Sequence, residues 1–298
     1  MAVAAQSLED RSSDRVNLGQ GAFDLVEGAL NYLVDTEVKP FAYNYEPPPG
    51  VPLRSGTYEE HRLPILNGRR RGEEFSLDRQ GFLFRRHETA VKDFYDPAEV
   101  EQVYYPEIEA LMKQATGAEK VVTFDHTLRV GPARQQKTPQ AQKAFREPVR
   151  RVHNDYTVKS GPQRVRDLLA PAEAEERLKQ RFAIVNIWRP IRGPVEEAPL
   201  AVCDARSIAA SDLIATDLRY PDRTGETYSV AYNPAHRWFY FPQMRREEVL
   251  FLKCYDSATD GRARFAAHTA FDDPTGPRLP IARESIETRS LLFFPPAT

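Results

Sequence analysis

Short apolar runs, separated by turn-forming residues, dominate the second half of the chain from about residue 150 onward. They lie at 182–188, 228–232, 238–241, 249–252, 264–268 and 290–294. Serial short strands with turns between them are typical of a sandwich or barrel rather than of alternating strands and helices. We therefore expect a mainly β protein, in which one helix within 161–169 or 172–181 interrupts the strands.

One helix is signalled clearly in the first half of the chain. Asp96 can cap its N-terminus, Pro97 suits the first turn, and Glu99 completes the sequence of a capping box. Gly117 is a residue that commonly ends a helix. The sequence therefore predicts a helix from Pro97 to about Thr116.

Strand and loop patterns surround that helix. Residues 82–84 and 120–125 are predicted strands, and 22–46 is predicted as strand pieces or a short helix followed by an extended arm. Residues 54–80 are rich in Arg and Glu, so we expect a solvated loop there. The polar stretch 131–148 is predicted to be a loop or lid.

These patterns together predict a mainly β fold with peripheral helices, namely a double-stranded β-helix or cupin-like jelly roll. We expect a single domain over residues 1–298. In this interpretation residues 1–20 are flexible, 21–150 form a helical and strand elaboration, and 151–298 form the jelly-roll core.

Composition supports this interpretation and excludes several classes of protein. The chain has 298 residues with 24 Pro, 16 Phe and 13 Tyr, which disfavours a helical bundle. Its net charge of −2 gives no general attraction to nucleic acid or to an anionic membrane. Apolar runs are far shorter than the roughly 20 residues of a membrane helix. We expect a cytoplasmic protein, monomeric or homodimeric, that binds neither nucleic acid nor membranes.

The low cysteine count narrows the possible metal chemistry. Only Cys203 and Cys254 are present, which excludes a disulfide framework and any multi-cysteine zinc or iron–sulfur site. Histidine and carboxylate ligands remain available. His153 and Asp155 form an H-x-D triplet, and residues two apart on an extended strand face the same side. An imidazole and a carboxylate would then point together into the barrel.

A late histidine can complete this pair. His268 ends a predicted strand, and with His153 and Asp155 it would form a two-His-one-carboxylate face that suits Fe(II) and leaves positions open for O2 and a cosubstrate. Arg283 and Ser285 follow, again two residues apart. A guanidinium fork and a hydroxyl can bind the distal carboxylate of 2-oxoglutarate. The triplet alone is a weak signal, and the order of all the parts strengthens it.

Five further residues are candidates for contacts around this centre. Asn186 is predicted to contact the cosubstrate. Arg189 either binds a carboxylate ligand or pairs with an internal acid, because burying an unpaired charge is costly. His126 and Arg129 are candidates for the substrate pocket, although His126 is equally well explained as a hydrogen-bonded core histidine. Thr157 shares the face of the H-x-D triplet and is predicted to contact the substrate.

The chain resembles the AsaB/CmcJ-type hydroxylase/desaturase family of fungal and bacterial natural-product pathways. The resemblance covers roughly residues 20–295 and is carried by stretches 124–129, 152–157, 186–190, 199–204, 239–242, 252–257, 268–272 and 283–287. It implies a non-haem iron oxygenase in which His153, Asp155 and His268 are the metal ligands. The expected function is Fe(II)- and 2-oxoglutarate-dependent hydroxylation or desaturation of a small natural-product intermediate, with O2 as cosubstrate.

Two alternatives stay open at this point. An iron-dependent oxidase of the same fold would form a ring or double bond without 2-oxoglutarate. A cupin-like module would bind a small molecule without catalysis. Methyl transfer is disfavoured, because the sequence lacks a glycine-rich strand-to-helix loop for a methyl donor.

Overall fold

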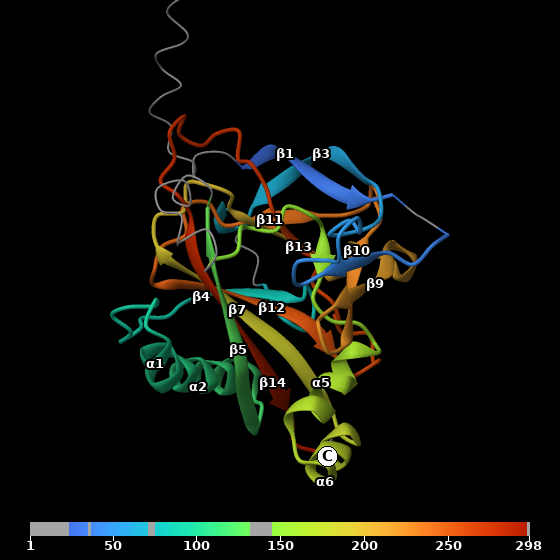
Figure 1. Cartoon of the computed structure of the whole chain (residues 1–298). Helices are drawn as coiled ribbons and strands as arrows, with labels where there is room; N and C mark the ends of the chain where they lie inside the picture. Colours follow the sequence, from blue (N-terminus) through green and yellow to red (C-terminus); the bar gives the residue numbers. More distant parts are fainter. Residues whose placement is uncertain (1–23, 35–36, 71–74, 132–144, 297–298) are drawn as a thin grey trace, which may run out of the picture.

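Two curled β-sheets face each other, with helices at their periphery (Figure 1). The computed structural model describes residues 24–34, 37–70, 75–131 and 145–296. In the described part of the chain, the nine-stranded sheet has the order β1-β3-β11-β8-β13-β6-β10-β9-β2, and the five-stranded sheet has the order β4-β12-β7-β14-β5. This arrangement confirms the predicted jelly roll.

The strands of the nine-stranded sheet are mostly short. They are β1 (Leu25–Leu33), β2 (Phe41–Tyr43), β3 (Tyr58–Asn67), β6 (His153–Asn154), β8 (Leu200–Cys203), β9 (Leu213–Arg219), β10 (Thr224–Val230), β11 (Trp238–Tyr240) and β13 (His268–Ala270). The five-stranded sheet has longer strands, which are β4 (Phe82–Arg86), β5 (Lys120–Val130), β7 (Phe182–Arg192), β12 (Glu248–Asp256) and β14 (Glu284–Phe293). Because β1 to β5 precede residue 151 and complete both sheets, the core is not confined to residues 151–298.

The two faces of the five-stranded sheet bury different cores. On β12, Leu250 and Leu252 point toward the nine-stranded sheet, whereas Val249 and Phe251 pack with helix α2 (Tyr105–Thr116). Figure 1 shows this helix beside the sheet. Burial on both faces explains why the central strands are almost continuously apolar.

The predicted helix forms, with one difference at its start. The Asp96 carboxylate accepts a hydrogen bond from the Ala98 backbone N–H at 2.9 Å, and Gly117 ends the helix at φ 74°. Glu99 does not complete a capping box, because its carboxylate accepts the backbone N–H groups of Lys92 and Asp93 instead. The helical stretch comprises α1 (Pro97–Glu99), the π-helical segment η3 (Val100–Tyr104) and α2.

Several sequence predictions need correction. The stretch 54–80 contains strand β3 rather than only a solvated loop. Both candidate helices form, as α5 (Ser160–Leu168) and α6 (Pro171–Leu178), so the second half has more than one. The run 264–268 becomes strand only at His268. Most of the loop predicted at 131–148 lies outside the described residues. The remaining elements are the short 3-10 turns η2 (Gly68–Arg70), η4 (Ala205–Ser207) and η5 (Ala210–Asp212).

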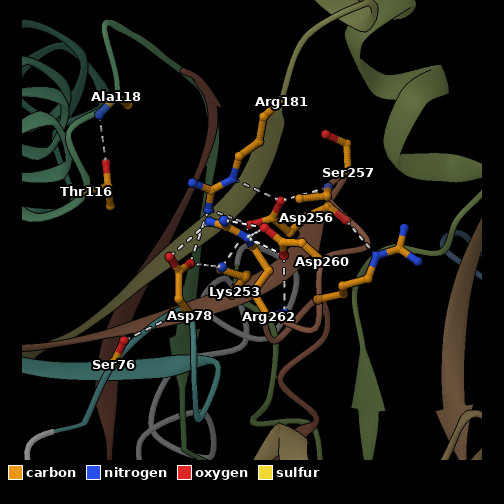
Figure 2. A network of polar contacts seen from close by, with 12 residues as sticks. Ser76, Asp78, Thr116, Ala118, Arg181, Lys253, Asp256, Ser257, Asp260 and Arg262 are labelled. Carbon is orange, nitrogen blue, oxygen red and sulfur yellow. Dashed lines mark hydrogen bonds and ion pairs between the residues drawn. The ribbon is translucent and has the colours of Figure 1, made fainter. Parts of the chain in front are cut away.

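A buried charge cluster lies beside β12 and is shown in Figure 2. The Lys253 ammonium group, 2% exposed, lies 2.6 Å from the Asp78 carboxylate and 2.8 Å from the Asp256 carboxylate. On the outer side of these acids, Arg181 binds Asp256 and Arg262 binds Asp78. No helix among the described residues is long and apolar enough to cross a membrane.

Candidate metal centre

Strand β6 brings the H-x-D triplet beside the late histidine. It is only two residues long and lies between β10 and β13, where His153 pairs with Ser229 on one side and with His268 on the other. Asp155 follows the strand at a bend. Its Oδ1 atom lies 3.6 Å from the His153 Nε2 atom. Two segments far apart in the sequence thus meet as neighbours in one sheet.

The two imidazole rings are held in the same way. His153 Nδ1 donates to the Arg151 carbonyl at 2.7 Å, and His268 Nδ1 donates to the Ala266 carbonyl at 2.9 Å. A carbonyl oxygen only accepts, so each Nδ1 carries the proton and each Nε2 presents its lone pair. Such backbone bonds are the usual means of fixing the tautomer of a metal-binding histidine.

One ligand atom from each of His153, Asp155 and His268 can be chosen so that all three lie within 4.8 Å of one another. Two imidazole nitrogens and one carboxylate oxygen are the donor set of non-haem Fe(II) oxygenases, which leaves coordination positions open. The three residues that the sequence predicted are therefore brought together, and their chemistry fits an iron ion.

The electrostatics favour the protonation states that a metal requires. Burial lowers the pKa of His153 to about 4, aided by the charge of His268, so its imidazole is neutral at pH 7. Burial alone would raise the pKa of Asp155, but the charges of Arg289 and the two histidines outweigh it and lower that pKa. Neutral imidazoles and an ionised carboxylate are the forms that bind metal ions.

A second set of side chains holds Asp155 in place. The Asn186 amide donates to Asp155 Oδ2 at 2.8 Å and to Glu287 Oε1 at 2.7 Å, and Arg289 Nε donates to Asp155 Oδ2 at 3.3 Å. The Oδ1 atom of Asn186 is buried without a hydrogen-bond partner. Asn186 is therefore positioned next to the centre, where the sequence predicted a cosubstrate contact.

Arg283 carries a buried positive charge without a close ion pair among the described residues. Its side chain donates to Ser285 Oγ at 3.1 Å and to the Ala198 carbonyl, and its Cζ lies 5.0 Å from the Trp188 ring. The Glu197 carboxylate accepts the Arg283 backbone N–H at 3.0 Å, but no carboxylate of the described residues lies within 4.0 Å of the guanidinium nitrogens. Burial, with the charge of Arg129, lowers its pKa to about 9. The Trp188 indole N–H is also buried without a partner. This arrangement fits an anion supplied from outside the protein.

A cavity of about 1810 Å³ opens beside the centre. His153, Asp155, His126 and Arg129 all line it. The His126 Nδ1 atom lies 2.9 Å from the Tyr105 hydroxyl, and Arg129 donates to the Glu147 carbonyl at 2.9 Å. Both residues predicted at the substrate pocket thus lie on its wall.

Two predicted contacts are wrong. Arg189 points to the opposite face of β7 from Asn186, where its guanidinium group bonds to Tyr104, the His87 ring and two backbone carbonyls. It pairs with no acid of the described segments. Thr157 is fully buried, and its hydroxyl binds Glu226 and caps the start of α5. The chain leaves the strand at Asp155, so the alternation that placed Thr157 at the site no longer holds.

Sequence reasoning missed Glu287 and Arg289. Both lie on β14 at alternate positions after Ser285, so they face the same side of the strand. The sequence contains a signal for them. If the strand predicted at 290–294 is continued toward Ser285, residues 285, 287 and 289 fall on one face. Arg289 lies against Asp125, Asp155 and Glu287 and links the three acids.

Comparison with known proteins agrees with this geometry. The profile of a family described as an oxidoreductase/YMDC permease-like domain matches residues 30–293. The hydroxylase/desaturase efuI of Hormonema carpetanum is 37% identical and covers 81% of this chain and 89% of its own length. The alpha-ketoglutarate-dependent dioxygenase phiK of Fungal sp. (strain ATCC 74256) is 37% identical over 76% of this chain and 82% of its own.

The solved structures point the same way. The structure of the iron and alpha-ketoglutarate-dependent endoperoxidase NvfI superposes with a TM-score of 0.81 at 27% sequence identity. The match covers 91% of this chain and 98% of that one. Together with the profile and the curated relatives, it shows that the chain belongs to the AsaB/CmcJ-type hydroxylase/desaturase family of non-haem iron oxygenases.

Proposed function

We propose that this protein is an Fe(II)- and 2-oxoglutarate-dependent oxygenase that hydroxylates or desaturates a small natural-product intermediate. One observation carries the proposal. Three ligand atoms of the required kinds meet within 4.8 Å, and two of the three residues line a cavity large enough for an organic substrate.

His153, Asp155 and His268 would hold the iron. When bound, Fe(II) supplies the redox chemistry with O2 that amino-acid side chains lack. The protein's own contribution is to fix the three ligands. Backbone carbonyls set the two histidine tautomers, while Asn186 and Arg289 hold the Asp155 carboxylate.

Arg283 and Ser285 would bind the distal carboxylate of 2-oxoglutarate. A fully buried guanidinium group without a counter-ion is costly, and an incoming carboxylate removes that cost. The unpartnered indole N–H of Trp188 is a further donor beside Arg283. His126 and Arg129 would contact the substrate from the cavity wall.

The proposal also covers the organisation and location of the protein. Strands from both halves complete each sheet, which supports one oxygenase domain over the whole chain. Cys203 and Cys254 are both buried free thiols, which supports action in a reducing compartment such as the cytoplasm.

The experiment is an anaerobic titration of the Fe(II)-loaded protein with 2-oxoglutarate. Chelation of Fe(II) by 2-oxoglutarate gives a weak visible absorption band, and succinate release then reports turnover in air. We expect the band in the wild-type protein, its loss in His153→Ala, and at least about tenfold weaker 2-oxoglutarate binding in Arg283→Met.

Arg192→Met is the matched control, since Arg192 lies at the same end of the sheet but its side chain is 58% exposed. Its 2-oxoglutarate affinity should stay within about twofold of wild type. A wild-type protein that binds iron but shows neither the band nor succinate would overturn the cosubstrate assignment and favour the oxidase that acts without 2-oxoglutarate.

A further inference from the structure

Arg151 lies on the same face of the chain as two of the proposed iron ligands. Residues 151–155 alternate between partly exposed and buried positions, so that Val152 and Asn154 are fully buried while Arg151, His153 and Asp155 are partly exposed, and these three line the cavity together with Val152. Positions two apart on extended chain are separated by about 6.6 Å. The Arg151 side chain therefore enters the cavity beside that of His153, two residues further along the chain.

The backbone and side chain of Arg151 are both held in position. The Val152 N–H donates to the Asn31 carbonyl at 2.9 Å, which ties this segment to β1. The Arg151 guanidinium carbon lies 5.6 Å from the centroid of the Tyr58 ring. A planar cation held over an aromatic ring keeps its N–H groups available to an anion.

Arg54 adds a second positive charge to the same cavity. Arg54 lies four residues before Tyr58, the residue over whose ring the Arg151 guanidinium group is placed. No carboxylate of the described residues lies within 4.0 Å of either guanidinium group. Lys39, by contrast, lies 2.5 Å from Asp217 and 2.7 Å from Glu226 in the same cavity. Within the described structure, the Arg54–Arg151 side of the wall therefore carries positive charge without a neighbouring carboxylate.

We propose that Arg151 and Arg54 form a subsite for a carboxylate group of the organic substrate, separate from the cosubstrate site at Arg283. This inference rests on the proposed function and specifies its substrate class. Two guanidinium groups offer the forked donors that match a carboxylate.

The same cavity offers apolar contacts to the rest of the substrate. Tyr43, Tyr45 and Leu53 line it among many charged and polar residues, and the last two are more than one-third exposed. Aromatic and aliphatic surface of this kind binds a carbon skeleton. The site thus fits a carboxylic acid with a bulky apolar body, whose acid group is anchored away from the carbon that reacts.

The test uses 1-pyrenebutyric acid and its methyl ester as fluorescent probes. Binding is followed by fluorescence anisotropy on the full-length protein, with Fe(II) and saturating 2-oxoglutarate under argon. We expect the acid to bind at least about tenfold more tightly than the ester, since each charge-assisted hydrogen bond to a carboxylate contributes about that factor or more. Arg151→Met and Arg54→Met should each remove most of this preference.

Arg223→Met is the matched control. Arg223 lines the same cavity, but Asp167 lies 3.4 Å away and already balances its charge. This variant should change the affinity for the acid by less than about twofold. Arg151→Lys, which keeps the charge, should retain part of the preference, and melting curves will show that each variant is folded.

Equal binding of acid and ester by the wild-type protein would overturn the proposal. So would displacement of the acid by 2-oxoglutarate together with loss of 2-oxoglutarate binding in Arg151→Met, because the subsite would then belong to the cosubstrate. The acid–ester comparison is repeated without iron and 2-oxoglutarate. It therefore reports on Arg151 even if Arg283 proves not to bind the cosubstrate.

Discussion

Two of the places where the molecule buries charged side chains balance those charges differently. Around Lys253, every buried charge lies within ion-pair distance of an opposite charge, and the outer ring of arginines completes the balance (Figure 2). Around the proposed iron ligands, acids are held by Asn186 and Arg289, but no carboxylate of the described residues lies within 4.0 Å of the Arg283 or Arg151 guanidinium group. The charges of the first cluster are balanced within the described structure, whereas we expect ligands to balance the second one.

This difference separates a structural cluster from a functional one better than burial does. Both clusters contain buried side chains, and both are built from residues distant in sequence. A buried charge without an acid can be satisfied by hydrogen bonds within the chain, as Arg189 is by Tyr104, the His87 ring and two backbone carbonyls, or by a ligand. The following predictions test this contrast, beginning with the largest expected effect.

His268→Ala should abolish iron binding and turnover. Without it the centre keeps only His153 and Asp155, which is too few protein ligands for tight Fe(II) binding. Metal analysis of anaerobically loaded protein, together with succinate release, is the measurement. His61→Ala is the control, since His61 stacks on Tyr232 away from the centre. Full iron content in His268→Ala would disprove this ligand assignment.

Lys253→Met should lower the free energy of unfolding by about 3 kcal/mol, near the lower end of the range for breaking a buried pair, because Arg181 still binds Asp256. Iron affinity should hardly change. Urea denaturation measures the first quantity and iron titration the second. Arg86→Met, from an ion pair in which both side chains are about three-quarters exposed, should leave the free energy of unfolding almost unchanged. A large loss of iron affinity in Lys253→Met would weaken the contrast between the clusters.

Asn186→Ala should weaken iron binding by about 10- to 100-fold, which is the usual effect of removing a group that orients a metal ligand. The amide lies between the Asp155 and Glu287 carboxylates, so its loss frees Asp155 and brings two acids into repulsion. Iron titration under argon provides the measurement. Asn233→Ala is the control, because Asn233 binds Asp212 instead. An unchanged iron affinity would show that Arg289 alone is sufficient to hold Asp155.

The smallest effect is expected from acid titration of the Lys253 cluster. Burial raises the pKa of Asp78, but Lys253, Arg181 and Arg262 outweigh burial and lower it. The stability from this carboxylate is therefore complete above its unfolded pKa of about 3.9 and is lost as the pH falls through the lower folded-state pKa.

Asp78→Asn should accordingly flatten the loss of stability below about pH 4. Urea midpoints measured between pH 3 and pH 6 are the test, and the two proteins should converge toward the acid end. A difference that stays constant over this range would show that Asp78 acts through packing and not through its charge.

Much of the centre was predictable because its chemistry is local in sequence. The H-x-D triplet, the late histidine and the Arg-x-Ser pair depend on residue type and on spacing by two, and the structure brings His153, Asp155 and His268 together as predicted. The jelly roll was predictable from its serial apolar runs. Its N-terminal strands were harder to predict, because in β3 the first residue, Tyr58, is followed by Glu59, Glu60 and His61, which resemble a solvated loop.

The errors at the candidate site arise because the sequence did not show to which face of a strand a side chain points. Strand β7 is buried on both faces, so its sequence shows no alternation that would reveal where Arg189 points. Its partners Tyr104 and His87 lie far away in the sequence. Arg151 was overlooked for a related reason, since a pair of arginines before the triplet looks like solvated surface. Only the tertiary structure shows that no acid accompanies it.

Because β6 pairs with β13, an iron ion held by His153 and His268 would also link two strands that are far apart in the sequence. His153 and His268 face each other across a strand pair of minimal length, and the chain between them contains strands β7 to β12 of the two sheets. A cation bound only in the folded state adds about 2.7 kcal/mol of stability at a concentration 100 times its dissociation constant. The melting temperature is therefore a gauge of iron occupancy, and it allows conditions and variants to be ranked before any substrate is known.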